Sequence, residues 1–209
     1  MYYSQAGQDM FVNETLNSKK NGYFLEIGSN DYKMHNNTYF FEKNLSWKGI
    51  MVEYDSNFLN GYKNYRSNSI HIIQDATKVN YLKLLIDNKF PKDIDYLQID
   101  LDVDNRSTLT TLEIFDKEIF DKYKFAAITF ETDIYRGNFY DTRKSSRAIF
   151  EKHGYKLVYP DVNIAYQGKL LGPFEDWWVH PDLVDTDKFK KIFDYKCPNG
   201  CCMINAVKI

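Results

Sequence analysis

Acidic side chains follow several apolar runs in this sequence, at positions where they can contact a ligand. A carboxylate can accept hydrogen bonds from hydroxyl groups, pair with a cation, or take a proton from a reacting alcohol. The acids at or just after these runs are Glu26, Glu53, Asp75, Asp100, Asp102, Glu131 and Asp133. The pattern therefore favours a binding or catalytic site that is rich in carboxylates.

The elements that would position these acids alternate between strand-like and helix-like runs. Strands are predicted over 22–28, 48–55, 69–76, 93–102 and 124–132, and helical spacing over 36–45, 56–65, 80–89, 107–123 and 142–154. Two further strands, within 155–162 and 175–183, follow one another without a helix. Near-continuous apolar strands separated by helices predict an α/β three-layer sandwich, with a mostly parallel sheet and an antiparallel strand pair at one edge. Ligands of such sheets bind beyond the carboxyl ends of the strands, where these acids would meet.

The first predicted strand ends in the turn Gly28-Ser29-Asn30. Gly28 permits a tight turn and close approach of a ligand, and Asn30 tolerates a positive φ better than most residues. The second glycine that makes room for a pyrophosphate in dinucleotide sites is absent, which favours a cofactor without phosphate. Glu26 is expected to pair with a cationic group of that ligand.

The next two strand ends fit the remaining parts of a nucleoside. Glu53 lies 25 residues after Gly28, a spacing at which carboxylates commonly accept hydrogen bonds from ribose hydroxyls. Asp75 and Ala76 end the third strand, where an adenine amino group and ring edge would lie. Together these strand ends predict a pocket for a ribose, an adenine and a cation.

Five stretches in order resemble the FkbM family of S-adenosylmethionine-dependent methyltransferases. They are SQAGQD, GYFLEIGSND, NNTYFFEKNLSWKGIMVEYD, IDYLQIDLDVDNRSTL and FEDWWVHPDLV, and the similarity extends from about residue 3 to 184. The resemblance implies a class I methyltransferase fold of seven strands with the last antiparallel, in a single domain over 1–209. It also implies O-methylation of a hydroxyl on a sugar, a glycan or a similar small polyol.

The resemblance also implies which residues bind the cofactor. The N-terminal segment 1–20 would cover it, Glu26 and Gly28 would line its methionine part, and residues 195–209 would form a tail. The implied cofactor-binding residues are Gln5, Gln8, Glu26, Gly28, Ser29, Asn30, Glu53, Asp75, Ala76 and Asp100. The sequence departs from the glycine-rich loop of this superfamily, because Asn30 and Tyr32 replace its second and third glycines.

Transfer of a methyl group to a sugar hydroxyl needs a base or a metal ion, because the hydroxyl is a weak acid. The first hypothesis is a carboxylate base, Asp102 or Glu131, which together could hold Mg²⁺ or Mn²⁺ through oxygen ligands. The second is His180, in EDWWVHPDL, acting directly. Asp133 and one of two adjacent tryptophans, Trp178, are the predicted acceptor contacts.

Two other functions compete with this interpretation. Asp100-Leu101-Asp102 is a D-x-D motif, which in a metal-dependent glycosyltransferase would hold a cation against a nucleotide-sugar diphosphate. Against it, Glu26 and Glu53 place acids where a diphosphate would be repelled. The other alternative is a non-catalytic α/β binding module, which the replaced glycines would permit.

Composition narrows the partners and the compartment. The net charge of −2 over 209 residues gives no basic surface, so we expect no nucleic-acid partner. No apolar run approaches about 18 residues, so we expect no membrane span. The opening MYYSQAGQDMFVNE lacks the basic and then apolar layout of a secretory signal. The three cysteines, Cys197, Cys201 and Cys202, are an odd number, so at least one thiol has no partner for a disulfide within the chain. These features predict a reducing, cytoplasmic location.

Overall fold

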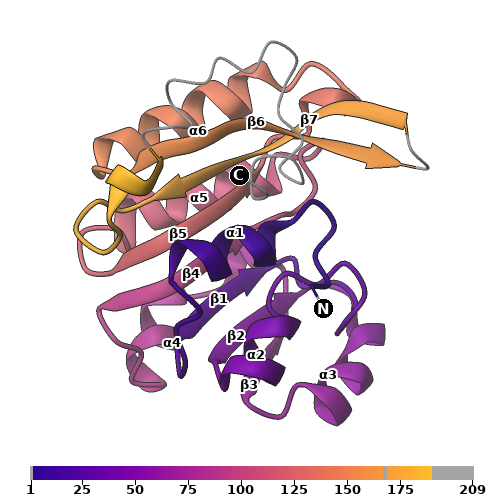
Figure 1. The fold of residues 1–209 in the computed structure, drawn as a ribbon. Coiled ribbons are helices and arrows are strands. Elements are labelled where there is room, and N and C mark those ends of the chain that lie inside the picture. Colours follow the sequence, from indigo (N-terminus) through magenta and orange to yellow (C-terminus); the bar gives the residue numbers. More distant parts are fainter. Residues whose placement is uncertain (1, 167–168, 190–209) are drawn as a thin grey trace.

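The computed structural model describes residues 2–166 and 169–189, and its centre is one seven-stranded sheet (Figure 1). The strand order is β3-β2-β1-β4-β5-β7-β6. All neighbouring pairs from β3 to β5 are parallel, whereas β7 is antiparallel to both of its neighbours. The strands are β1 Tyr23–Ile27, β2 Lys48–Glu53, β3 Ser69–Ile73, β4 Asp93–Ile99, β5 Lys124–Glu131, β6 Lys156–Tyr166 and β7 Lys169–Val179. The predicted α/β class and the mostly parallel sheet with an antiparallel last strand are confirmed.

Helices cover both faces of the sheet and make the predicted sandwich (Figure 1). The α-helices are α1 Gln8–Thr15, α2 Tyr39–Leu45, α3 Leu59–Tyr65, α4 Tyr81–Asp87, α5 Ser107–Glu118 and α6 Tyr140–Lys152. Short 3-10 helices are η1 Ser56–Phe58, η2 Ala76–Lys78, η3 Ile134–Arg136 and η4 Thr186–Phe189. The first three α-helices pack on one face, and α4, α5 and α6 pack on the other.

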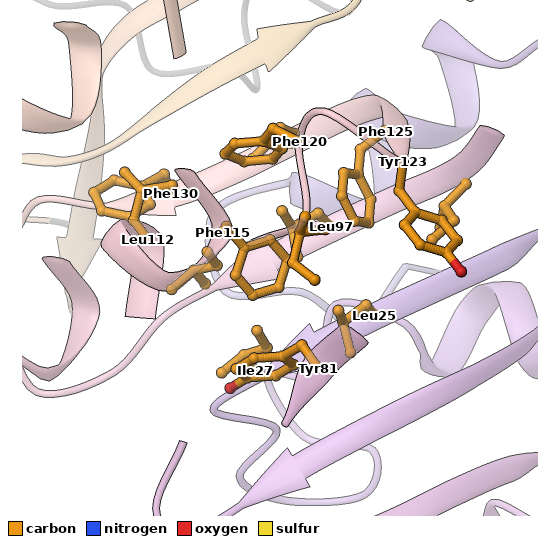
Figure 2. Close-up of a cluster of buried hydrophobic side chains, with 14 of the residues drawn as sticks. Leu25, Ile27, Tyr81, Leu97, Leu112, Phe115, Phe120, Tyr123, Phe125 and Phe130 are labelled. Carbon is orange, nitrogen blue, oxygen red and sulfur yellow. The ribbon is translucent and has the colours of Figure 1, made fainter. Parts of the chain in front are cut away.

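Alternation along the buried strands divides the core into two layers. In β1, Leu25 and Ile27 point toward α4 and α5, while Phe24 and Glu26 point toward the opposite face. Figure 2 shows the first layer, where Leu25, Ile27 and Leu97 of the strands pack near Phe115 of α5. The aromatic rings that follow α5, Phe120, Tyr123 and Phe125, belong to the same cluster. This two-sided burial holds the carboxyl ends of β1, β2, β4 and β5 along one edge.

The hairpin of β6 and β7 extends beyond the rest of the sheet. The strand expected from residue 175 begins at Lys169, because residues before Glu175 pair only with β6. Since β7 runs opposite to β5, its middle lies beside the carboxyl end of β5 and its last residues lie at the other edge. This reversal decides which β7 residues can approach a site at the carboxyl edge.

Some predicted features lie outside the described residues. These are the tail at 195–209 and the three cysteines at 197, 201 and 202. Within residues 2–166 and 169–189, no helix combines the length and the apolar character needed to cross a bilayer.

Candidate functional site

A cavity of about 430 Å³ opens at the carboxyl ends of β1, β2, β4 and β5. It is lined by Gln5, Gly28, Ser29, Asn30, His35, Asn37, Glu53, Tyr54, Gln98, Asp100, Leu101, Asp102, Glu131, Asp133, Tyr135, Arg136 and Phe174. Nine of the predicted site residues line this cavity: Gln5, Gly28, Ser29, Asn30, Glu53, Asp100, Asp102, Glu131 and Asp133. The predicted edge of the sheet therefore carries a cavity lined by the predicted residues.

Gly28 allows β1 and β4 to meet at the floor of this cavity. Its φ is +84°, and a Cβ at this position would lie 1.7 Å from the carbonyl oxygen of Asp100. The Gly28 N–H donates to the carbonyl of Val52 at 2.9 Å, and the Asp100 N–H donates to the carbonyl of Ile27 at 3.0 Å. Only glycine, which has no Cβ, permits this close approach of the two chain segments.

Glu53 fixes the two loops on the other side of the cavity. Its Oε2 accepts the Asn30 N–H at 2.8 Å, and its Oε1 accepts the N–H groups of Tyr54 at 2.8 Å and Asp55 at 2.9 Å. The carboxylate thus holds the β1 turn against the β2 turn. Each carboxylate oxygen has two lone pairs, so Oε2 keeps one for a ligand hydroxyl.

Three carboxyl groups gather where β4 and β5 end. Ile99 pairs with Phe130, so Asp100 and Glu131, the next residue of each strand, are neighbours on one face of the sheet. Burial and the adjacent charges of Asp100 and Asp133 raise the pKa of Glu131 well above its usual range. Burial raises the pKa of Asp100 to about 6, although its hydrogen bond with Glu131 opposes the shift. The raised pKa favours the protonated form of Glu131, which can share its proton with Asp100 through their hydrogen bond.

Asp102 and Arg136 lie nearer the mouth of the cavity. Asp102 is exposed and accepts the Asp104 N–H at 3.0 Å and an Asn105 Nδ2 hydrogen at 3.3 Å. Arg136 bridges two loops, with Nη1 at 2.6 Å from Asp133 Oδ2 and Nη2 at 2.7 Å from Asp104 Oδ2. In the described part of the chain, no three His, Cys, Asp or Glu side chains are arranged to hold a metal ion. The expected Mg²⁺ or Mn²⁺ site on Asp102 and Glu131 is not supported.

Comparison with solved structures places this architecture among known folds. A TehB-like S-adenosylmethionine-dependent methyltransferase from Corynebacterium glutamicum matches with a TM-score of 0.53 and 13% identity, over 83% of this chain and 86% of that chain. Precorrin-6y C5,15-methyltransferase from Geobacter metallireducens matches with a TM-score of 0.53 and 13% identity, over 82% and 86%. The methyltransferase domain of METTL16 gives 0.56 and 8%, over 82% and 65%.

The fold is that of the class I methyltransferases. At these identities the similarity establishes the fold and not the reaction. No protein-family model and no curated protein sequence matches the chain, so membership of the FkbM family stays a prediction.

Glu26 does not line the cavity of this class I fold. It is fully buried on the face opposite Leu25, where its Oε2 accepts a hydrogen from Asn36 Nδ2 at 3.1 Å. Asn36 in turn accepts a hydrogen from Arg66 Nη1 at 2.9 Å through its Oδ1. The predicted contact with a ligand cation is replaced by a contact with the loop after β1, because strand alternation turns Glu26 into the protein.

Replacing Glu26 with glutamine is expected to flatten the pH dependence of stability. Burial raises the pKa of Glu26 from 4.5 to about 6, so the folded state binds this proton more tightly than the unfolded state. The tighter binding of this proton stabilises the folded state by about 2 kcal/mol below about pH 4.5. This stabilisation is lost as the pH rises through about 6. Urea unfolding at both ends of that window measures it. A variant with the same pH dependence as the parent would contradict this assignment.

The N-terminal segment reaches the cavity through Gln5 and not through Gln8. Gln5 is a lining residue, and Ser4 forms an isolated parallel bridge with His35 of the loop after β1. Gln8 is buried at the start of α1, and its Oε1 accepts the Ala6 N–H at 2.8 Å. Gln8 therefore stabilises the turn that positions Gln5. Of the two glutamines, only Gln5 can make the predicted contact with a ligand in the cavity.

Asp75 and Ala76 lie at the carboxyl end of β3, on the correct edge of the sheet but outside the cavity lining. Asp75 caps η2, with its Oδ1 accepting the Thr77 N–H at 3.0 Å, and pairs with Lys78 at 3.0 Å. Ala76 is buried in the core beneath α5. The expected adenine contact at this strand end stays a prediction.

His180 and Trp178 lie away from the cavity because β7 is antiparallel. Glu175 pairs with Glu131 at the carboxyl edge, while the His180 N–H donates to the carbonyl of Ala126 near the other edge. Five residues of strand separate these points, about 17 Å. Trp178 is fully buried against Phe150 of α6. We therefore assign His180 no catalytic role and Trp178 no acceptor contact.

Several lining residues were missed by sequence analysis. Gln98 is a polar residue inside an apolar run, which is a signal that could have been used. Asn37 and Tyr54 stand next to recognised turns. Tyr135 and Phe174 carry no local signal, because their position depends on η3 and β7 packing together with ring centroids 6.4 Å apart.

Proposed function

We propose that this chain is an S-adenosylmethionine-dependent O-methyltransferase that acts on a hydroxyl of a sugar, a glycan or a similar small polyol. The observation that carries the proposal is the carboxyl-lined cavity at the switch edge of a class I fold. Its buried oxygens without a hydrogen-bond partner include Glu131 Oε2 and Asp133 Oδ1. A ligand that donates many hydrogen bonds and carries positive charge would satisfy them.

The residues present fit this cofactor. Its sulfonium and ammonium groups are positively charged, and the lining acids Glu53 and Asp100 lie against the β1 turn at Gly28 and Asn30. Gly28, Ser29 and Asn30 would hold the methionine part, and Glu53 and Tyr54 the nucleoside. When bound, the cofactor supplies an activated methyl group on a sulfonium.

The residues of the chain would position the acceptor and remove its proton. Asp100, with its pKa raised to about 6, is a stronger base than an ordinary aspartate and is ionised at neutral pH. Glu131 would stabilise the Asp100 carboxylate by hydrogen bonding. Asp102 is a second base at the mouth. Tyr135 and Phe174 would pack against a sugar ring.

The glycosyltransferase alternative is not supported. Asp100 and Asp102 of the D-x-D motif lie beside Glu131 and Asp133, and Arg136 is the single Lys or Arg among the cavity-lining residues that the structure describes. A diphosphate would meet excess negative charge there. The acidic lining likewise disfavours a nucleic-acid acceptor.

Binding and turnover assays test the proposal. Calorimetry with S-adenosylhomocysteine and with UDP-glucose is expected to show binding of the first alone. Mass spectrometry after incubation with labelled methyl donor and a panel of sugars is expected to show methylated product. Binding of the nucleotide sugar alone would overturn the proposal.

Glu53→Gln is expected to weaken S-adenosylhomocysteine binding by about 1–3 kcal/mol, because a charged acceptor is lost to the ribose and to the Asn30 N–H. Calorimetry measures the change. Asp55→Asn is the matched control, since Asp55 is an exposed acid two residues away that caps η1 and does not line the cavity. Equal affinities for the parent and Glu53→Gln would show that the ribose binds elsewhere.

A further inference from the structure

We infer that the acceptor carries a protonated amine, as in an amino sugar, and that Glu131 and Asp133 bind this ammonium group. The inference rests on the proposed function and adds the chemical class of the acceptor. It concerns the side of the cavity built by β5, η3 and β7, away from the Gly28 turn and Glu53.

Two buried oxygens on this side lack a partner. Glu131 is 6% exposed and Asp133 is 1% exposed, and both line the cavity. Glu131 Oε2 and Asp133 Oδ1 have no N–H or hydroxyl partner within the described residues. Buried acceptors left in this state are costly, and native proteins rarely keep them without a ligand or water to satisfy them.

The charge on this side is also unbalanced. Arg136 is the cation here, and its guanidinium is already engaged with Asp133 Oδ2 and Asp104 Oδ2. It therefore leaves Asp133 Oδ1 unpaired and makes no ion pair with Asp100 or Glu131. A neutral hydroxyl would supply a hydrogen bond but no charge, whereas an ammonium group supplies three donors and a positive charge.

The adjoining wall also suits a cation. Tyr135 and Phe174 line the same side, with ring centroids 6.4 Å apart and planes at 66°. Aromatic faces attract an ammonium group and pack against a sugar ring. Carboxylates with an aromatic wall thus match an acceptor that is both a ring and a cation.

The test compares paired sugars that differ in one group. Protein saturated with S-adenosylhomocysteine is titrated by calorimetry with glucosamine and glucose, and with galactosamine and galactose, at about pH 6.5, where an amine is protonated. A chelator is present throughout to exclude metal ions. We expect at least one amino sugar to bind about tenfold or more tightly than its neutral partner.

Variants locate the ammonium group. Asp133→Asn removes a negative charge, and Glu131→Gln replaces a carboxyl oxygen with an NH2 group that cannot accept a hydrogen bond from the ammonium. Each variant is expected to weaken amino-sugar binding about tenfold and to leave S-adenosylhomocysteine affinity unchanged, which also shows that it folds. Asp104→Asn is the matched control, because Asp104 contacts the same Arg136 but is 56% exposed and lies outside the cavity lining. It is expected to bind amino sugars as the parent does.

Each result separates the inference from the proposed function. If S-adenosylhomocysteine binds but the paired sugars bind equally, or none binds, the inference is overturned and the methyltransferase proposal stands. If Glu131→Gln and Asp133→Asn weaken S-adenosylhomocysteine binding instead, the acids hold the cofactor's own ammonium and the inference is again overturned. Failure of S-adenosylhomocysteine to bind the parent protein overturns the proposed function itself.

Discussion

Replacing Gly28 with alanine is expected to lower the free energy of unfolding by at least about 3 kcal/mol. The φ of +84° costs a residue with a Cβ about 1–2 kcal/mol. The new methyl group would also lie 1.7 Å from the Asp100 carbonyl oxygen, so β4 and β1 would have to separate. Urea unfolding monitored by tryptophan fluorescence measures the loss. Calorimetry should also show weaker S-adenosylhomocysteine binding, because the cavity floor moves.

Gly7→Ala separates the two causes. Gly7 has a φ of +93° at the start of α1, but a Cβ there would meet no atom within 4 Å. Gly7→Ala should therefore lower the free energy of unfolding only by the conformational cost of a positive φ, about 1–2 kcal/mol. Equal losses in Gly7→Ala and Gly28→Ala would show that close approach of β1 and β4 is not important to the fold.

Arg66→Met is expected to destabilise the protein by about 3–5 kcal/mol, because it removes one partner of a buried ion pair. Arg66 is fully buried at the end of α3, and its Nε donates to Glu42 Oε2 at 2.8 Å. Its Nη1 also bonds Asn36 Oδ1, and its Nη2 bonds Thr38 Oγ1 at 2.6 Å. Without the guanidinium, the buried Glu42 carboxylate would keep only the half-exposed Lys43 ammonium, 3.9 Å away, as an ionic partner. Urea unfolding at neutral pH measures the effect.

Two comparisons test this explanation. The double variant Arg66→Met with Glu42→Leu should regain part of the lost stability, since no unpaired charge is left. Lys83→Met removes one partner of an exposed pair in α4, with Lys83 Nζ 2.5 Å from Asp87 Oδ2, and should cost less than about 1 kcal/mol. A double variant no more stable than Arg66→Met would show that packing, and not charge, dominates at this site.

The Arg66 network also links the fold to the cavity. Asn36 bonds both Glu26 and Arg66, and it directly precedes Asn37, which lines the cavity. The acid at the end of β1 therefore acts on the site by holding a loop in place. This explains why a carboxylate can stand in a buried strand directly before a glycine turn without contacting a ligand.

The amino-acid sequence by itself determined the strands, the sandwich and the edge that carries the acids. Period-two burial and apolar runs are local properties, and parallel strands bring their carboxyl ends to one edge whatever their order. Gly28, Glu53, Asp100 and Glu131 therefore gather as predicted.

The tertiary structure alone decided which side chains face the cavity. Alternation along β1 turns Glu26 to one face of the sheet, but only the tertiary structure places Asn36, and through it Arg66, on that face to bind it. Because β7 is antiparallel to β5, His180 lies at the opposite edge of the sheet and Phe174 lies beside the cavity. Strand direction and long-range pairing depend on contacts between distant segments, which no local pattern records.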